Sequence, residues 1–389
     1  MEQWVQTWGQ AHTALSAFSF SNMCRTFRLI INTAIGGKRV QVQLSNAHGA
    51  LPVTLGGVCV ARCDANGVLL GDSVDLDAPQ TLAAGESIVT GSGALTLAPG
   101  DWFCVSLCVQ AGELQSGNLE NTARCLVLPG DSRHAIYPTP TTRFKETVRK
   151  GACKLLRMQL KPPVPLFETV EVLNDTGASS IAVFGDSLSQ QGFWTQPFER
   201  RIRERFPGRF SVINRGINGN RVLRDTSPVF PFKGFYGVRG VNRLQRDILQ
   251  YPDVSHAILS LGVNDLIQYA SINGKPQEKP DIDVLCEAIF SLSDRMRANG
   301  IRVMGCTLVN FRDCIDATDE KADQCDQVNA VLRENEARFD CLFDLNAVVA
   351  DPAKPQHSRL DYLGKDKLHF NIIGGAAVAD AIDLGFFRP

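Results

Sequence analysis

Residues 181–188 read IAVFGDSL, and this stretch decides how the second half of the chain is expected to fold. Four apolar residues in a row are typical of a short strand that is buried on both faces of a sheet. The Gly-Asp-Ser that follows marks a turn, and apolar residues at helical spacing come soon after it, at Phe198, Ile202 and Phe206. The segment therefore predicts a strand, a turn that carries a serine, and a helix.

The same alternation continues to the C-terminus. Helix-period patterns separate further strand-like runs. The clearest of these patterns spans residues 282–296, and Gly300 marks the end of the predicted helix. Strands that alternate with helices predict a parallel sheet covered on both faces, and we expect a flavodoxin-like three-layer α/β/α domain with five parallel strands. The later strand-like runs are FSVIN (210–214), AILSLG (257–262), IRVMGC (301–306) and CLFDL (341–345).

The first part of the chain has a different character. It contains short β-rich runs separated by Gly, Asn, Asp and Pro, and WFCVSLCV (102–109) alternates with period 2 as a half-buried strand does. This pattern predicts an antiparallel, jelly-roll-like β-sandwich. We expect an N-terminal β-sandwich domain at residues 1–172 and an α/β domain at residues 173–389, joined by a proline-rich crossing.

Composition excludes several classes of protein. The 389 residues carry 40 Lys+Arg and 41 Asp+Glu, so no surplus of positive charge favours nucleic-acid binding. No apolar run approaches the length of a membrane span, and the first residues lack the pattern of a secretory signal. We therefore expect a cytoplasmic protein whose partner is neither nucleic acid nor membrane, and a homo-oligomer is left open.

Twelve cysteines are the unusual feature of the composition. They form no CxxC pair, and several lie inside apolar strand-like runs, as Cys59, Cys104 and Cys108 do. Free cysteine packs as a small hydrophobic residue, so we expect reduced core thiols. Disulfides stay open if the protein is exported.

Reactive side chains follow four of the predicted strands. Ser187 lies on the turn after the first strand, and Gly216 and Gly219 lie in the loop after the second. Asn264 follows the third strand, and His369 comes three residues after Asp366 near the C-terminus. A serine on such a turn, a histidine that takes its proton and an aspartate that orients the histidine make a nucleophilic triad. Taken singly, each residue is equally explained as a helix cap, a turn or a packed side chain.

The four segments together resemble the SGNH hydrolases, also called the GDSL esterase/lipase superfamily. GDSL stands at residues 185–188, the glycine block at 214–219, GxND at 262–265 and DxxH at 366–369, in the family's order. The segment TFRLIINTAIGGKRVQVQLSNAHG (26–49) is similar to the β-sandwich that precedes the catalytic domain in one esterase subgroup. Phe370 stands where many members have proline after the histidine.

The resemblance implies a role for each residue. Ser187 would attack an ester carbonyl, His369 would be the general base, and Asp366 would hold the imidazole. The oxyanion hole would consist of the Ser187 and Gly219 backbone N–H groups and the Asn264 side-chain amide. No cofactor is expected, and no catalytic metal, because Asp366 and His369 alone make an incomplete ligand set.

Other residues near these segments keep two interpretations. Asp186, Trp194, Arg221 and Asp265 are candidates for substrate contacts, but turn hydrogen bonding, core packing, ion pairing and loop fixing explain them as well. Phe193 and Tyr236 are aromatic candidates of the same kind. Of the remaining histidines only His357 lies near the DxxH segment.

We expect a serine esterase for short-chain acyl groups, with acetylated carbohydrates as the favoured substrates. A β-sandwich partner suits carbohydrate, and the loops lack the apolar stretches of an acyl tunnel. The alternatives are a short-chain lipase, arylesterase or thioesterase of the same superfamily, and a non-catalytic carbohydrate-binding protein with a hydrolase fold.

Overall fold

A computed structural model of the chain describes residues 2–15, 24–119, 122–140, 163–225, 234–268 and 279–388. The chain forms two compact units, each described here by itself. The boundary predicted between residues 172 and 173 falls within strand β14 (Phe167–Asn174). The first unit holds Met1–Ser180, Phe206–Ile213 and Phe230–Phe235, and the second holds Ile181–Arg205, Asn214–Val229 and Tyr236–Pro389.

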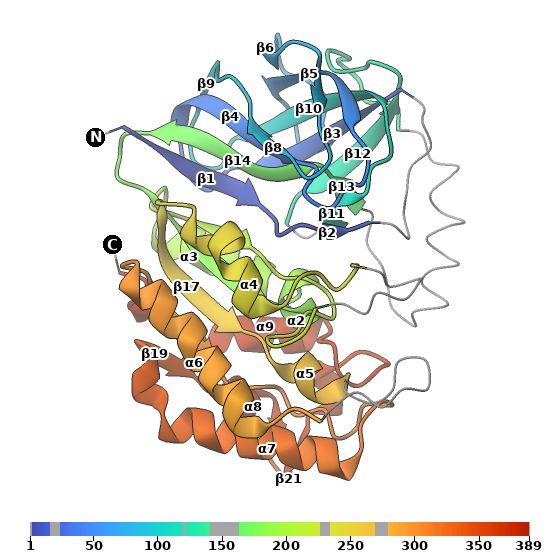
Figure 1. Cartoon of the computed structure of the whole chain (residues 1–389). Coiled ribbons are helices and arrows are strands. Elements are labelled where there is room, and N and C mark those ends of the chain that lie inside the picture. The colour runs from blue at the N-terminus through green and yellow to red at the C-terminus, as the bar shows by residue number, and fades with distance from the viewer. Residues whose placement is uncertain are drawn as a thin grey trace. The chain divides into compact units, whose positions relative to one another are not determined.

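The described part of the first unit contains two larger antiparallel sheets and one small one (Figure 1). One sheet has the order β1 (Gln3–Gly9), β14, β4 (Gly37–Ser45) and β8 (Ser87–Val89), with β9 (Gly93–Leu97) also on β4. The other has the order β12 (Arg124–Pro129), β3 (Arg25–Asn32), β10 (Trp102–Ala111), β5 (Val53–Arg62) and β6 (Val74–Asp77), with β7 (Gln80–Leu82) on β5. The small sheet holds β13 (Pro163–Pro165), β11 (Ser116–Leu119) and β2 (Thr13–Ala14).

Alternate residues of these strands build the core between the two larger sheets. Phe27 and Leu29 of β3 and Val105 of β10 belong to this core, whereas Ile30 and Cys104 lie on the opposite face in a second apolar cluster. The expected β-sandwich is therefore confirmed. The expectation that residues 102–109 form a half-buried strand is wrong for β10, because the second cluster covers its other face as well.

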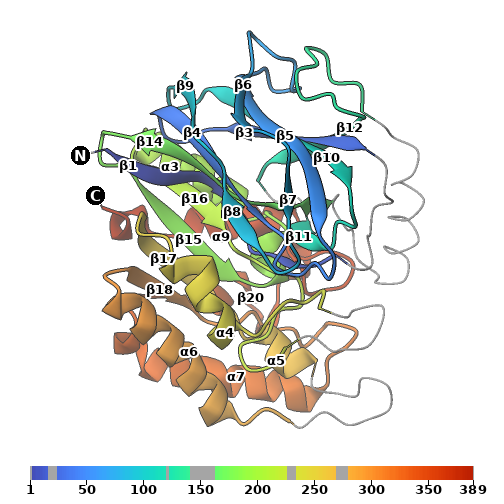
Figure 2. The same ribbon diagram turned by 45° about the horizontal axis from the view of Figure 1, so that its top comes forward.

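The parallel sheet of the chain has five strands, of which Figure 2 shows β16, β15, β17 and β18 side by side; most of β16 falls among the residues of the first unit, and the other strands fall wholly or mainly in the second. Its first strand along the chain, β15, lies between the second and the third. This order is the flavodoxin-like one, and it places the point where the order reverses beside β15. The strands in spatial order are β16 (Phe210–Asn214), β15 (Ser179–Gly185), β17 (Val254–Ser260), β18 (Arg302–Cys306) and β19 (Cys341–Phe343).

Helices cover both faces of this sheet. Helix α3 (Thr195–Arg205) contacts α9 (Ile372–Ala381), while α6 (Ile282–Ala298) contacts α4 (Gly240–Leu244) and α7 (Asp319–Glu334). Right-handed crossovers on either side of β15 place α3 and α9 on one face of the sheet and α4, α6 and α7 on the other. The three-layer fold predicted from the sequence is thus confirmed. The remaining elements are α2 (Ser187–Gln190), the π-helix η2 (Gln245–Leu249), α5 (Val263–Ile267), the 3-10 helices η3 (Glu336–Arg338), η4 (Leu360–Tyr362) and η5 (Leu384–Phe386), α8 (Leu345–Val349), β20 (Ala350–Asp351) and β21 (Lys354–Ser358).

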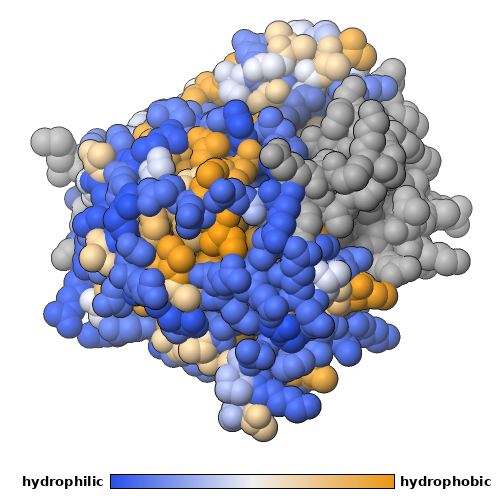
Figure 3. Space-filling view, turned by 60° about the horizontal axis from the view of Figure 1, so that its bottom comes forward, coloured by the Kyte–Doolittle hydropathy of each residue, from blue (hydrophilic) through white to orange (hydrophobic). Residues whose placement is uncertain are grey.

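The cysteines of the described residues are all free thiols, and most of them are buried. Cys24 is exposed and Cys341 half-buried, while Cys153 lies outside the described residues. No helix within the described ranges has the length and hydropathy needed to cross a membrane. The face in Figure 3 is mostly hydrophilic, with hydrophobic residues gathered in a smaller area.

Candidate active site

The serine of the GDSL segment lies directly after the central strand. Strand β15 ends at Gly185, where an added Cβ would lie 2.4 Å from Ser189 Oγ and 2.9 Å from the Ser260 carbonyl oxygen. Only glycine therefore fits at this strand end. Helix α2 begins at Ser187, and the carboxylate of Asp186 caps it by accepting a hydrogen bond from the Leu188 backbone N–H at 3.0 Å. This local geometry fixes the position of the Ser187 side chain.

A chain of hydrogen bonds joins three of the predicted site residues. His369 Nε2 lies 2.8 Å from Ser187 Oγ, and His369 Nδ1 lies 2.7 Å from Asp366 Oδ2. The other carboxylate oxygen of Asp366 accepts the backbone N–H groups of Leu368 and His369, at 3.1 and 3.0 Å. The turn 366–369 thus holds the carboxylate in the position from which it contacts the imidazole.

The charge on Asp366 fixes the direction of these hydrogen bonds. Burial raises the pKa of Asp366, but the hydrogen bonds and charge of His369 and the bond from Leu368 outweigh burial, and its pKa is about 2. The ionised carboxylate can only accept, so His369 Nδ1 carries the proton and donates it. In the neutral imidazole, His369 Nε2 is then the acceptor for the Ser187 hydroxyl, which is the arrangement that a general base requires.

The predicted oxyanion donors lie on the loops after β15, β16 and β17. Gly219 has a φ of +67°, and a Cβ there would lie 2.4 Å from the Tyr236 ring, so the loop requires glycine at this position. Asn264 lies in α5 and donates both N–H bonds of its amide within the protein, to Asp186 Oδ2 at 3.2 Å and to the Asn220 carbonyl at 3.1 Å. An oxyanion can therefore bind the amide only if one of these bonds changes partner.

Asp186 is buried beneath this amide. Burial raises its pKa to about 7, although the Leu188 N–H and the charges of His369 and Arg243 act in the opposite direction. Its contacts to Leu188 and Asn264 assign it to the turn and to the orientation of the amide.

The other three candidates for substrate contacts are buried too. Trp194 is buried and packs against Phe198 with ring centroids 6.2 Å apart. Asp265 accepts the backbone N–H groups of Val222 and Leu223 at 2.7 and 3.0 Å and so fixes that loop. Arg221 donates to the carbonyl of Asp225.

Two further side chains organise the site and carry no signal in the four motifs. Gln268 donates to Asn264 Oδ1 at 2.9 Å and to the Gly219 carbonyl at 3.3 Å, and thereby fixes which way the Asn264 amide points.

His357, the histidine nearest the DxxH segment in the sequence, pairs with Asp313 at 2.9 Å and makes no contact with the triad among the hydrogen bonds of the described residues.

The second organising residue is Arg243, whose guanidinium is fully buried under the site. It donates to the carbonyls of Gly185 (2.8 Å) and Arg215 (2.9 Å) and to Asn220 Oδ1 (2.9 Å). It also pairs with Asp247 at 2.8 Å, and its guanidinium carbon lies 3.9 Å from the centre of the Phe184 ring. One side chain therefore ties the end of β15 to the glycine loop. The spacing of Arg243 and Asp247, four residues apart in a predicted helix, was the only sequence signal for it.

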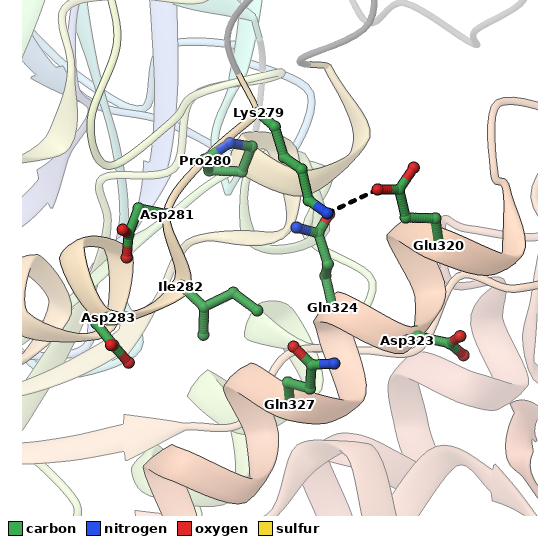
Figure 4. A pocket seen from close by; sticks show the side chains of 9 residues that line it. All are labelled: Lys279, Pro280, Asp281, Ile282, Asp283, Glu320, Asp323, Gln324 and Gln327. Atoms are coloured by element: carbon green, nitrogen blue, oxygen red, sulfur yellow. Dashed lines mark hydrogen bonds and ion pairs between the residues drawn. The ribbon is translucent and has the colours of Figure 1, made fainter.

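A pocket of about 810 Å³ lies elsewhere in the second unit, between the start of α6 and α7 (Figure 4). Charged and amide side chains line it, and Lys279 Nζ lies 2.6 Å from Glu320 Oε1 across it. None of the residues that line it belongs to the hydrogen-bonded chain of Ser187, so it is not part of the candidate active site.

Comparison with known proteins identifies a family. The model of the GDSL-like lipase/acylhydrolase family matches residues 183–377, whereas no protein with a curated description matches the chain. The chain is similar in structure to the acetyl xylan esterase AlAXEase, with 20% identity, a TM-score of 0.38, and coverage of 52% of this chain and 96% of that one.

Two further solved structures are similar to the same part of the chain. For a GDSL-like lipase from Bacteroides thetaiotaomicron the identity is 14% and the TM-score 0.37, with coverage of 54% of this chain and 88% of that one. For TesA the values are 15% and 0.36, with coverage of 52% and 94%.

Proposed function

The chain belongs to the GDSL-like lipase/acylhydrolase family, and on this premise we propose that it is a serine esterase with Ser187, His369 and Asp366 as its catalytic triad. One observation carries the proposal: the unbroken hydrogen-bonded chain from Asp366 through His369 to Ser187, with contacts of 2.7 and 2.8 Å. Such a chain couples loss of the hydroxyl proton to attack on a carbonyl.

The proposed triad would carry out the reaction in the following steps. Ser187 Oγ attacks the ester carbonyl while His369 Nε2 takes its proton, and the ionised Asp366 stabilises the imidazolium that forms. The tetrahedral intermediate then collapses, and Nε2 gives the proton to the departing alcohol oxygen. A water molecule next loses a proton to Nε2 and attacks the acyl-enzyme, which releases the acid and restores Ser187.

The negative oxygen of each tetrahedral intermediate requires donors. We assign this role to the backbone N–H groups of Ser187 and Gly219 and to the Asn264 amide. Because both N–H bonds of that amide are used, the oxyanion replaces one acceptor, and the 3.2 Å contact to Asp186 is the longer of the two. Gln268 keeps the nitrogen side of the amide turned to this position during the exchange.

For the substrate we propose short-chain acyl esters, with acetylated carbohydrates first. The β-sandwich unit and the lack of long apolar loop segments favour carbohydrate over long acyl chains.

A panel of substrates tests the proposal. We expect purified protein to hydrolyse aryl acetate, and kcat/KM to fall steeply as the acyl chain grows beyond propionyl. Acetylated xylose and cellobiose oligomers, scored by released acetate, test the carbohydrate acceptor. A rise of kcat/KM with chain length would favour a lipase or thioesterase instead.

Two serines of the same helix provide the variant and its control. Ser187→Ala is expected to abolish turnover of aryl acetate. Ser189→Ala removes a buried hydroxyl without a hydrogen-bond partner within the described residues, and it should leave turnover nearly unchanged. Equal activity of the Ser187→Ala variant and the unmodified protein would overturn the catalytic assignment.

A further inference from the structure

Three side chains of different chemistry converge on the first unit, away from the esterase residues. Cys59 of β5 and Asp75 of β6 are direct register partners, so their side chains project from the same face of the sheet. His134 follows β12 and reaches the same place. One potential ligand atom from each residue lies within 4.8 Å of the other two, and His134 Nε2 lies 3.6 Å from Asp75 Oδ1.

We propose that Cys59, Asp75 and His134 form a transition-metal site that suits Zn²⁺, on the face of the six-stranded sheet opposite the sandwich core. A thiolate, an imidazole and a carboxylate are the three ligand types that zinc takes in proteins. Metal–ligand bonds of about 2.0–2.3 Å place neighbouring ligand atoms of a tetrahedron roughly 3.3–3.8 Å apart. The separation of His134 and Asp75 falls in this range, and a small inward movement brings Cys59 into it.

The ring of His134 is held in the orientation that such a site requires. Ser73 Oγ lies 2.5 Å from His134 Nδ1, and this contact leaves Nε2 facing Asp75 and Cys59. Histidine ligands of metals commonly form such a hydrogen bond through the other ring nitrogen, which sets the tautomer and the direction of the ring.

The segment that carries His134 is fixed by a buried cation. Arg28 is fully buried, and its guanidinium donates to the carbonyls of Ser132 (3.2 Å) and Arg133 (3.0 Å). Its Nε also donates to Ser106, at 3.0 Å, and Ser106 is the register partner of Cys59. The backbone before His134 is therefore tied to the same row of the sheet as the cysteine, so the site is largely formed before a metal arrives.

Solvent reaches the proposed site, and Asp75 gives it negative charge. Cys59 is buried, while the side chains of Asp75 and His134 are 59% and 50% exposed, so a fourth ligand from water has access. Arg133 also contacts Asp75, at 3.3 Å, but its charge is mainly balanced by Asp131, at 2.9 and 3.0 Å. A divalent ion then meets the charge of Asp75 and the neutral thiol of Cys59, which donates to the Arg133 carbonyl at 3.5 Å. As the metal–sulfur bond forms, the thiol proton passes to solvent, and no oxidation state changes.

Cobalt(II) is the probe, because a cobalt–thiolate bond gives a charge-transfer absorption band that zinc lacks. We expect one equivalent of Co²⁺ to produce this band in the untagged full-length protein, and one equivalent of Zn²⁺ to remove it. Ser73→Ala should weaken the affinity by about 10–100-fold, as the loss of an outer hydrogen bond to a ligand histidine does.

Variants of the ligands make the test specific. Cys59→Ser should abolish the band, and His134→Gln, at a half-exposed position that leaves folding intact, should weaken binding strongly. Cys63→Ala is the matched control, since Cys63 is a buried cysteine of the same face adjoining the same strand, and it should retain the band. Absence of the band in the unmodified protein, or its survival in Cys59→Ser, would overturn the proposal. Either outcome leaves the esterase assignment untouched, because no triad residue takes part.

Discussion

Replacement of Arg243 by methionine is expected to destabilise the second unit and slow the esterase together. Methionine keeps most of the volume and the contact with Phe184 but loses every hydrogen bond of the guanidinium. The acceptors left behind are the carbonyls of Gly185 and Arg215, the side chain of Asn220 and the buried carboxylate of Asp247. All four lie in or under the candidate active site.

The magnitude follows from burial. Removing one partner of a buried ion pair costs about 3–5 kcal/mol, because the other charge stays buried. Asp247 keeps a second partner in Arg246, at 2.8 Å, which reduces this cost, while the loss of one donor at each of the other three acceptors adds to it. We therefore expect a loss of about 3–5 kcal/mol, or a melting temperature roughly 6–20 °C lower for a unit of this size.

Differential scanning calorimetry and aryl acetate turnover measure the two effects. Arg246→Met is the control, because Arg246 is 27% exposed and also contacts Asp247, and its loss should cost clearly less. Arg243→Lys keeps the charge but cannot reach all four acceptors, so it should fall between the two. A melting temperature of Arg243→Met within about 2 °C of the unmodified protein would refute the reasoning, since it would mean a loss of 1 kcal/mol or less.

Three further predictions concern substitutions of Asp366, Gly219 and Asp186. Asp366→Asn should lower kcat by up to about 10⁴-fold in aryl acetate turnover, because the amide removes the charge that orients His369, whereas a fall below tenfold would contradict the assigned tautomer. Gly219→Ala should lower kcat by about 10²-fold or more with little change in KM, because a Cβ there meets the Tyr236 ring and displaces an oxyanion donor. Asp186→Asn should flatten the pH dependence of stability. Burial raises the pKa of Asp186 from 3.8 to about 7, so its contribution to stability is complete below about pH 3.8 and is lost as pH rises through 7. In urea unfolding, the difference in unfolding free energy between variant and unmodified protein should change by up to about 1.4 kcal/mol per pH unit between about pH 4 and 7. A difference that stays constant over this range would contradict the raised pKa of Asp186.

The order of strands and helices and the residues at the strand ends could be predicted from the sequence. Helices are visible because their apolar residues repeat at a fixed spacing, as in 282–296, and α6 covers this range. Short strands are visible because each is a continuous apolar run. The four motifs then indicated which residues meet, and the structure does bring Ser187, His369 and Asp366 together.

The partners of buried polar groups could not be predicted in this way. The guanidinium of Arg243 joins segments that lie 23 to 58 residues away, and no local pattern records such contacts. The same holds for Gln268, which acts on Asn264 from one helical turn away but looks like any polar helix residue. Burial on the second face of β10 was also missed, because alternation reports on one face only, and on the other face Cys104 belongs to a second apolar cluster with residues such as Ile30 and Leu126.

The strand order explains why the oxyanion donors come from three separate segments. Because β15 lies between β16 and β17, the loops after these three strands meet at one edge of the sheet. Each carries one of the donors that we propose: Ser187, Gly219 and Asn264. The same convergence places Asp186 beneath the Asn264 amide, where the carboxylate occupies an N–H bond that the oxyanion needs. A negative oxygen on the substrate competes for that bond only once charge develops on it, whereas a neutral ester carbonyl is the weaker acceptor. In the proposed mechanism, Asp186 would therefore make the third donor selective for the transition state over the bound ester, which is the differential binding that accelerates a reaction.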